Sequence, residues 1–87
     1  MHELSLIIDL LRKIEAISRE QGSRRVTGVK VRIGALAHIS AEHFRDHFTR
    51  AARGTVAEGA WLETEMLTDM TDPHAQEILL DSVEVED

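Results

Sequence analysis

The chain has 87 residues, of which 43% are hydrophobic and 30% charged, and it contains no cysteine. This composition is typical of a globular protein, and the lack of cysteine excludes a disulfide framework, a Cys-ligated zinc site, an iron–sulfur cluster and a thiol nucleophile. Apolar runs are no longer than three residues, whereas a bilayer span needs about 20, and no secretory signal pattern opens the chain. We therefore expect a cytoplasmic protein without a membrane segment.

The net charge of −6 is unevenly distributed along the chain. Residues 1–53 hold all ten lysines and arginines, whereas residues 54–87 hold ten acidic residues and no basic one. Phosphate contacts need cations, so this distribution argues against nucleic acid as a partner of the second half. It favours a basic protein surface or the chain's own basic half as the partner. The alternative is a solvated acidic strand and tail.

The first predicted elements are a helix and a strand. Residues 4–21 have apolar side chains at helical spacing and charged side chains opposite them, which predicts an amphipathic helix ended by Gly22 and Ser23. Residues 29–33 alternate strictly between apolar and cationic side chains. This alternation predicts a strand that is covered on one face and carries two cations on the other.

A second helix is predicted from Ser40 to about Arg53. Ser40 is a suitable N-cap, and Gly54 is a suitable stop. Phe44 and Phe48 lie four residues apart and, with two later alanines, form an apolar face. This face is expected to pack on the same core as the first helix.

Two further strands complete the predicted fold. Residues 60–67 and 77–86 have strand composition, and a turn is predicted at residues 71–74. The apolar phase of the last strand slips, which predicts a bulge near Asp81 and Ser82. The sequence thus predicts one α+β domain over residues 1–87, with two helices on a three-stranded sheet in the order helix-strand-helix-strand-strand.

The N-terminus offers a candidate metal site. The amine of Met1, the backbone nitrogen of His2 and the Nδ1 atom of His2 can close a five-membered and a six-membered chelate ring around one ion. Glu3 can add its amide nitrogen or its carboxylate. Square-planar nitrogen donors suit Ni(II) and Cu(II) rather than zinc. The alternative is a frayed, solvated chain end.

The other four histidines are weaker candidates. His43 and His47 are spaced so that one helix face could present both imidazoles to a metal. The alternative is a half-buried position for both at the rim of the apolar face. His38 and His74 are isolated in predicted loops, where we expect exposed side chains without a specific role.

Signs of catalysis are sparse. No serine has a base at a fixed local spacing, and no glycine-rich phosphate loop is present: residues 54–59 lack the lysine and the following helix that such a loop requires. We therefore do not expect an autonomous enzyme.

Several segments together resemble a known family. They are Met1-His2-Glu3-Leu4-Ser5-Leu6, Val31-Arg32-Ile33-Gly34-Ala35-Leu36, residues 54–60 followed by Leu62-Glu63, and the closing strand 81–86. Their order and sequence resemble HypA (also HybF), the nickel-insertion accessory protein of [NiFe] hydrogenase maturation.

This resemblance implies a metallochaperone that binds Ni(II) transiently through Met1, His2 and Glu3. Such a protein would pass the ion to a hydrogenase large subunit or another nickel-enzyme precursor with the help of the GTPase HypB. The family also has a zinc module with two Cys-x-x-Cys pairs between the last two strands, where this chain has only residues 70–75. Structural zinc is therefore not expected. Two alternatives are a HypA-like adaptor or small subunit of an enzyme complex, and an unrelated small enzyme.

The acidic half also contains a candidate docking strand. Trp61 lies beside Glu63 and Glu65 in the predicted strand at residues 60–67. Aromatic side chains rimmed by charge are typical of interface centres, and a small sheet has exposed edges. We expect this strand to contact a partner protein or a second copy of the chain, with Trp61 half-exposed.

Overall fold

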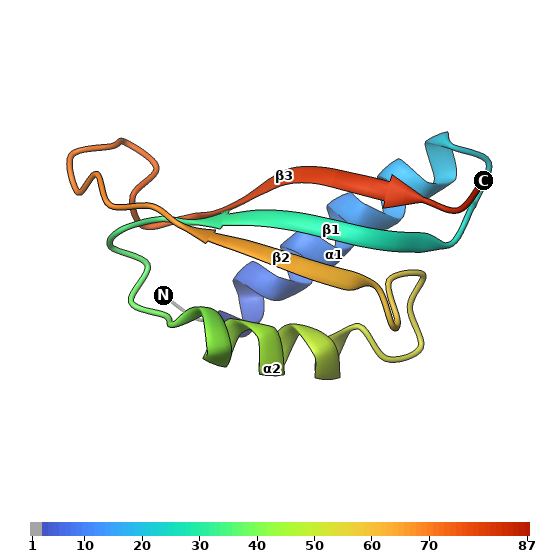
Figure 1. The fold of residues 1–87 in the computed structure, drawn as a ribbon, viewed down its shortest axis with the longest axis horizontal. Coiled ribbons are helices and arrows are strands. Elements are labelled where there is room, and N and C mark those ends of the chain that lie inside the picture. Colours follow the sequence, from blue (N-terminus) through green and yellow to red (C-terminus); the bar gives the residue numbers. More distant parts are fainter. Residues whose placement is uncertain (1–2) are drawn as a thin grey trace.

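The computed structural model describes residues 3–87. Within these residues two helices and one three-stranded sheet follow each other as helix, strand, helix, strand, strand, so the predicted α+β fold is confirmed (Figure 1). No helix in this range is long and apolar enough to cross a membrane. The elements are α1 (Glu3–Glu20), β1 (Val26–Ile33), α2 (Ala41–Ala51), β2 (Trp61–Met66) and β3 (Ile78–Val85).

The predicted first helix corresponds to α1 to within one residue at each end. The chain leaves the helix through Gly22, whose φ of 83° lies in the left-handed region that glycine adopts without strain. The N–H of Ser23 then donates to the carbonyl of Ser18 at 2.8 Å, so a carbonyl of the last turn keeps a partner. The predicted stop at Gly22 and Ser23 is confirmed.

The predicted cap of α2 is also confirmed. The side chain of Ser40 accepts a hydrogen bond from the N–H of His43 at 3.1 Å, which satisfies one of the free donors of the first turn. The helix ends at Ala51, two residues earlier than predicted. It stops there because Thr55 donates both its N–H (3.0 Å) and its hydroxyl (2.7 Å) to the carbonyl of Ala52, which closes a turn.

In the sheet, β1 lies between β2 and β3, with β2 parallel and β3 antiparallel to it. Lys30 pairs with Ser82 and the next residue, Val31, pairs with Leu80, so Asp81 is the extra residue of a bulge in β3. The bulge predicted from the phase slip is therefore confirmed.

The central strand β1 begins at Val26, three residues earlier than predicted. A second register shift lies between Val26 and Gly28. This irregularity breaks the period of two that identifies a strand in a sequence. The alternation therefore becomes regular only from Val29 onward.

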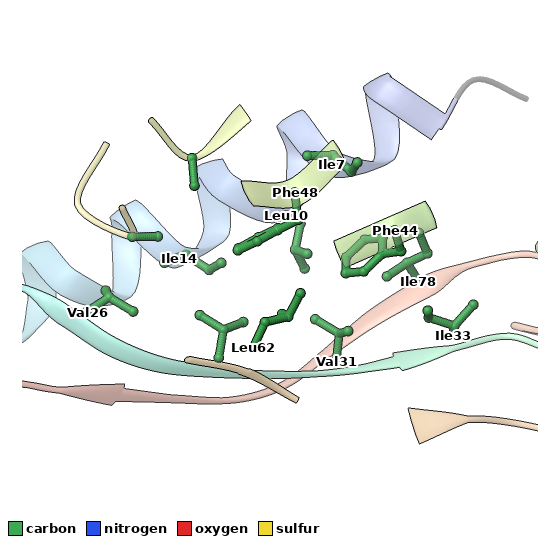
Figure 2. Packing of buried hydrophobic residues seen from close by; sticks show 13 residues of the cluster. Ile7, Leu10, Ile14, Val26, Val31, Ile33, Phe44, Phe48, Leu62 and Ile78 are labelled. Carbon is green, nitrogen blue, oxygen red and sulfur yellow. The ribbon is translucent and has the colours of Figure 1, made fainter. Parts of the chain in front are cut away.

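Both helices cover the same face of the sheet, and one hydrophobic core lies between the helices and this face (Figures 1 and 2). Phe44 and Phe48 of α2 pack with ring centroids 5.8 Å apart, within the range that is favourable for aromatic pairs. The buried side chains of α1 and of all three strands meet them there: Ile7, Leu10, Ile14, Val26, Val29, Val31, Ile33, Leu62 and Ile78.

The end of β1 is tied to the connection between β2 and β3 at Gly34. A Cβ at this position would lie 2.2 Å from the carbonyl oxygen of Ala75, so only glycine allows the two backbones to approach this closely. The N–H of Gly34 donates to the carbonyl of Glu77 at 2.9 Å, and Leu36 donates to Ala75 at 2.7 Å. These bonds fix the start of the loop that leads to α2.

Candidate metal centre

Two of the three predicted nickel ligands, Met1 and His2, lie outside the described residues. The third, Glu3, is the first residue of α1. The predicted ligand set therefore stays a prediction, and the structure describes only the surroundings of Glu3. These surroundings involve α2, the loop after β1 and the start of β3.

The carboxylate of Glu3 lies against the imidazole of His47 on α2, with Oε2 of Glu3 beside Nδ1 of His47. Both side chains are partly exposed, at 28% for Glu3 and 39% for His47, but the Oε2 atom itself is shielded from solvent. Within residues 3–87, the imidazole of His47 is the polar group beside this atom, and Oε2 accepts no well-aligned hydrogen bond. The start of α1 is thus attached to α2 through Glu3.

Glu3 also lines a surface hollow of about 410 Å³. The opposite wall is formed by the loop after β1 and by the start of β3, because α1 and β1 run in opposite directions and α1 begins where β1 ends (Figure 1). The lining residues are Glu3, Leu6, Leu36, Ala37, His38, Ile39, Gln76 and Ile78. The hollow therefore adjoins the N-terminal end of α1, where the candidate metal site is expected.

His38 is an exposed loop residue, as expected, and it also lines the same hollow as Glu3. Its φ is 57°, in the left-handed region where histidine is enriched among non-glycine residues. No periodicity in the sequence indicates this position. The signal that could have found it is topological, because the loop after β1 must lie near the beginning of an antiparallel α1.

The two histidines of α2 do lie on neighbouring turns, with ring centroids 5.0 Å apart and the rings tilted by 43°. His47 contacts Glu3, whereas His43 has no ion pair with residues 3–87. In this part of the chain no three histidine, aspartate or glutamate side chains are grouped so that they could hold a metal ion. The described side chains alone therefore offer no group of three such ligands.

His74 lies in the connection between β2 and β3, far along the chain from Glu3. Its Nδ1 atom is 2.7 Å from Oε2 of Glu77. This hydrogen bond and the charge of Glu77 raise the pKa of His74 above its usual value, and the charge of Asp72 adds to the effect. His74 and Glu77 are exposed, so His74 forms a local surface pair, and its expected exposure is confirmed.

Comparison with known proteins identifies relatives over most of the chain. A family model described as HypA, hydrogenase/urease nickel incorporation, metallochaperone, matches residues 1–72. The hydrogenase maturation factor HypA of Methylocella silvestris is 40% identical over 67 residues, which are 77% of this chain and 59% of that protein. Its counterpart in Acidithiobacillus ferrooxidans is 48% identical over 63 residues, which are 72% of this chain and 56% of that protein. The chain thus matches between half and two thirds of the length of these relatives.

Solved structures show the same fold. The solution structure of the Ni metallochaperone HypA from Helicobacter pylori has a TM-score of 0.78 with 18% sequence identity, and the match covers 98% of this chain and 97% of that one. The family model covers residues 1–72, which include all the segments on which the resemblance was based except the closing strand 81–86. The chain belongs to the HypA family of nickel-incorporation proteins.

Proposed function

We propose that this chain is a nickel carrier that binds Ni(II) through Met1, His2 and Glu3 and delivers it during [NiFe] hydrogenase maturation. The observation that carries the proposal is the position of Glu3. Its backbone begins α1 and its carboxylate is held by His47, at the edge of an open hollow. The names of the relatives support the same function, since those proteins are hydrogenase maturation factors.

The chemistry of the proposed site follows from its donor atoms. The Met1 amine, the His2 backbone nitrogen and His2 Nδ1 supply three nitrogens, and Ni(II) favours such donors in a square plane. Glu3 is the first residue of α1, so its N–H has no acceptor within the helix. The amide nitrogen of Glu3 can therefore coordinate the ion without breaking a helical hydrogen bond, while its carboxylate stays with His47.

The site is suited to transient binding. Protons must leave the amine and the amide nitrogens before they coordinate, so affinity is expected to rise with pH through the α-amino range near about 8. A ligand set built from consecutive residues can release its ion stepwise, one donor at a time. We infer a cargo site on these grounds, in a protein that transports the ion and does not catalyse a reaction.

The proposed carrier works without structural zinc. The chain has no cysteine, so it cannot build the Cys-rich sites that hold structural zinc in proteins. The connection between β2 and β3 is instead closed by short-range bonds, with Thr71 bonding to Asp69 and the N–H of His74 donating to Asp72 at 2.8 Å. We propose that residues 1–87 act as one nickel-binding domain of this kind.

The proposed partners are a hydrogenase large subunit, or another nickel-enzyme precursor, and a HypB-type GTPase in the cytoplasm. A second candidate function is that of an adaptor or small subunit that keeps the fold and has lost metal delivery. The observation that favours it is the missing zinc module, because the segment between β2 and β3 contains no cysteine. An adaptor would need a docking surface but no nickel ligands.

Capture of the partner from the native host separates the two functions. Wild type, His2→Ala and the matched control His43→Ala are each expressed without an N-terminal tag, and nickel in the captured partner is measured. A carrier predicts that His2→Ala captures the partner without nickel while His43→Ala is unaffected. An adaptor predicts no effect of His2→Ala, and a partner without nickel in every sample would overturn the carrier.

A further inference from the structure

The face of the sheet opposite the helices has three cross-strand rows of side chains, defined by the strand register. In each row, one residue comes from β2, one from β1 in the centre and one from β3. Row one is Trp61, Gly28 and Glu84; row two is Glu63, Lys30 and Ser82; row three is Glu65, Arg32 and Leu79. The bulge residue Asp81 lies between rows two and three.

In rows two and three, the central cation of β1 forms ion pairs with acidic residues of the neighbouring strands. Lys30 Nζ lies 3.6 Å from Oε2 of Glu63 and 3.6 Å from Oδ2 of Asp81. Arg32 lies 3.5 Å from Glu65 through Nε and 3.6 Å from Asp81 through a terminal nitrogen. Each cation of β1 therefore lies between an acidic residue of β2 and the bulge aspartate of β3.

Row one has no central cation, because β1 contributes a glycine there. Glu84 forms no ion pair with any residue from 3 to 87, and Trp61 is 75% exposed, more than the half exposure expected from the sequence. A Cβ at Gly28 would lie 3.6 Å from the carboxyl group of Glu84, an ordinary contact, so the carboxyl group lies beside the glycine. An unpaired carboxylate and an exposed indole thus flank a position that has no side chain.

A small hollow of about 160 Å³ marks this position. We call it the row-one notch, and its lining residues are Gly28, Val29, Lys30, Trp61, Glu63, Ser82 and Glu84. Its one cation, Lys30, is already shared between Glu63 and Asp81. The notch therefore keeps a negative charge and an aromatic wall.

We propose that the row-one notch binds an arginine side chain of a partner protein, which supplies the cation that β1 lacks in this row. A guanidinium group is planar, so it can stack on the indole of Trp61 and donate to the carboxylate of Glu84 at the same time. The surrounding segment favours a basic partner, since residues 54–87 contain ten acidic residues and no basic one. The notch lies on the opposite face of the sheet from the helices and Glu3, so this inference does not depend on nickel binding.

The absence of a side chain at Gly28 is what leaves room for the guanidinium. The φ angle of Gly28 is not positive, so the backbone conformation itself does not require glycine here. A larger, β-branched side chain would fit the strand conformation and would fill the notch. Gly28→Val therefore tests the notch without removing a charge or the indole.

The experiment uses the single tryptophan of the chain as a reporter. The untagged protein is titrated with the peptide acetyl-Gly-Arg-Gly-amide and, as the matched control, with the same peptide containing citrulline, which has the same shape without the charge. Trp61 fluorescence and the NMR shift of its indole N–H are followed. We expect saturable binding of the arginine peptide, weakened by added salt, and at least about fivefold weaker binding of the citrulline peptide.

Three variants test the assignment of the residues. Glu84→Gln is expected to weaken binding by about twofold to fivefold, and Gly28→Val to abolish it. The control Glu20→Gln removes an exposed charge at the end of α1 and should leave binding unchanged. All three should bind Ni(II) like wild type, which separates this proposal from the proposed function. Equal responses to the two peptides, or wild-type binding by both Glu84→Gln and Gly28→Val, would overturn the proposal.

Discussion

The carboxylate of Glu3 at the start of α1 lies against the imidazole of His47 on α2. Two residues that are 44 positions apart in the sequence thus hold the N-terminal end of α1 on the second helix. In the proposed nickel site Glu3 is one of the three ligand residues, and its contact with His47 holds the Glu3 side chain in place before any ion binds. A residue that is already held in place loses less conformational entropy when it takes part in binding.

Removing the imidazole of His47 is expected to weaken nickel binding without changing its stoichiometry. His47→Ala should lower the Ni(II) affinity by about threefold to tenfold, the size expected for a partly exposed polar contact that holds Glu3 in place. His43→Ala is the matched control, because its ring lies 5.0 Å from that of His47 but does not pair with Glu3. Isothermal titration calorimetry of both variants measures the difference, and a larger loss in His43→Ala would contradict this role of His47.

The core of the fold is expected to be most sensitive at Phe44. This side chain is fully buried, and truncation of a buried phenylalanine costs about 3–5 kcal/mol through lost burial and the cavity left behind. A domain of this size has little stability in reserve, so Phe44→Ala should unfold at low denaturant concentration or fail to fold. Leu4→Ala is the control, since Leu4 is 61% exposed. Equal denaturation midpoints for the two variants would contradict the packing described here.

Gly34→Ala is expected to destabilise the fold by about 1–3 kcal/mol, the usual cost of overpacking. The new Cβ would lie 2.2 Å from the carbonyl oxygen of Ala75, so the two backbone segments have to move apart. Gly28→Ala is the matched control, because a Cβ there has ordinary contacts at 3.6 Å. Urea denaturation compares the two variants. An unchanged free energy of unfolding in Gly34→Ala would show that the fold does not require the close contact between the backbones of Gly34 and Ala75.

The pKa of His74 is expected above the ordinary histidine value of about 6.5, because the carboxylate of Glu77 accepts its hydrogen bond and stabilises its charged form. A raised folded-state pKa adds stability that is fully present below the unfolded value and is lost as pH rises through the folded value. NMR titration of the His74 ring measures the pKa directly. In Glu77→Gln the pKa should fall toward the ordinary value, and an unchanged titration would contradict the pairing.

Local features of the sequence were enough to predict most of the fold. The amphipathic period of α1, the Ser40 cap and the phase slip at Asp81 each depend on residues close together in the chain, and all three are confirmed. The start of β1 was missed because a register shift near Gly28 interrupts its alternation. Short-range patterns thus fail where the backbone departs from regular geometry.

The surroundings of the candidate site could not be predicted in the same way. The contact between Glu3 and His47 depends on how two helices are placed on the sheet. The position of His38 in the wall of the hollow depends on a positive φ, 57°, that its residue type permits but does not dictate. The missing cation of row one becomes visible only when the strand order places Gly28 between Trp61 and Glu84. All three features are products of tertiary arrangement.

Removal of metal is expected to leave the fold intact. No three metal-binding side chains are grouped within residues 3–87, and the core is built from apolar side chains. Thermal unfolding with and without EDTA should therefore give nearly the same midpoint. A decrease of more than about 10 °C would indicate a structural metal, since about 1 kcal/mol shifts the midpoint of a domain of this size by roughly 4–8 °C.

The central claim is that the N-terminal residues bind nickel, and the most direct test is a Ni(II) titration of the untagged, metal-free protein followed by absorption spectroscopy. We predict about one Ni(II) per chain with the yellow absorption band of a square-planar site, an affinity that rises with pH, and loss of the band in His2→Ala. Full stoichiometry in His2→Ala, together with loss of binding in the double variant His43→Ala/His47→Ala, would contradict the account and place the site on α2.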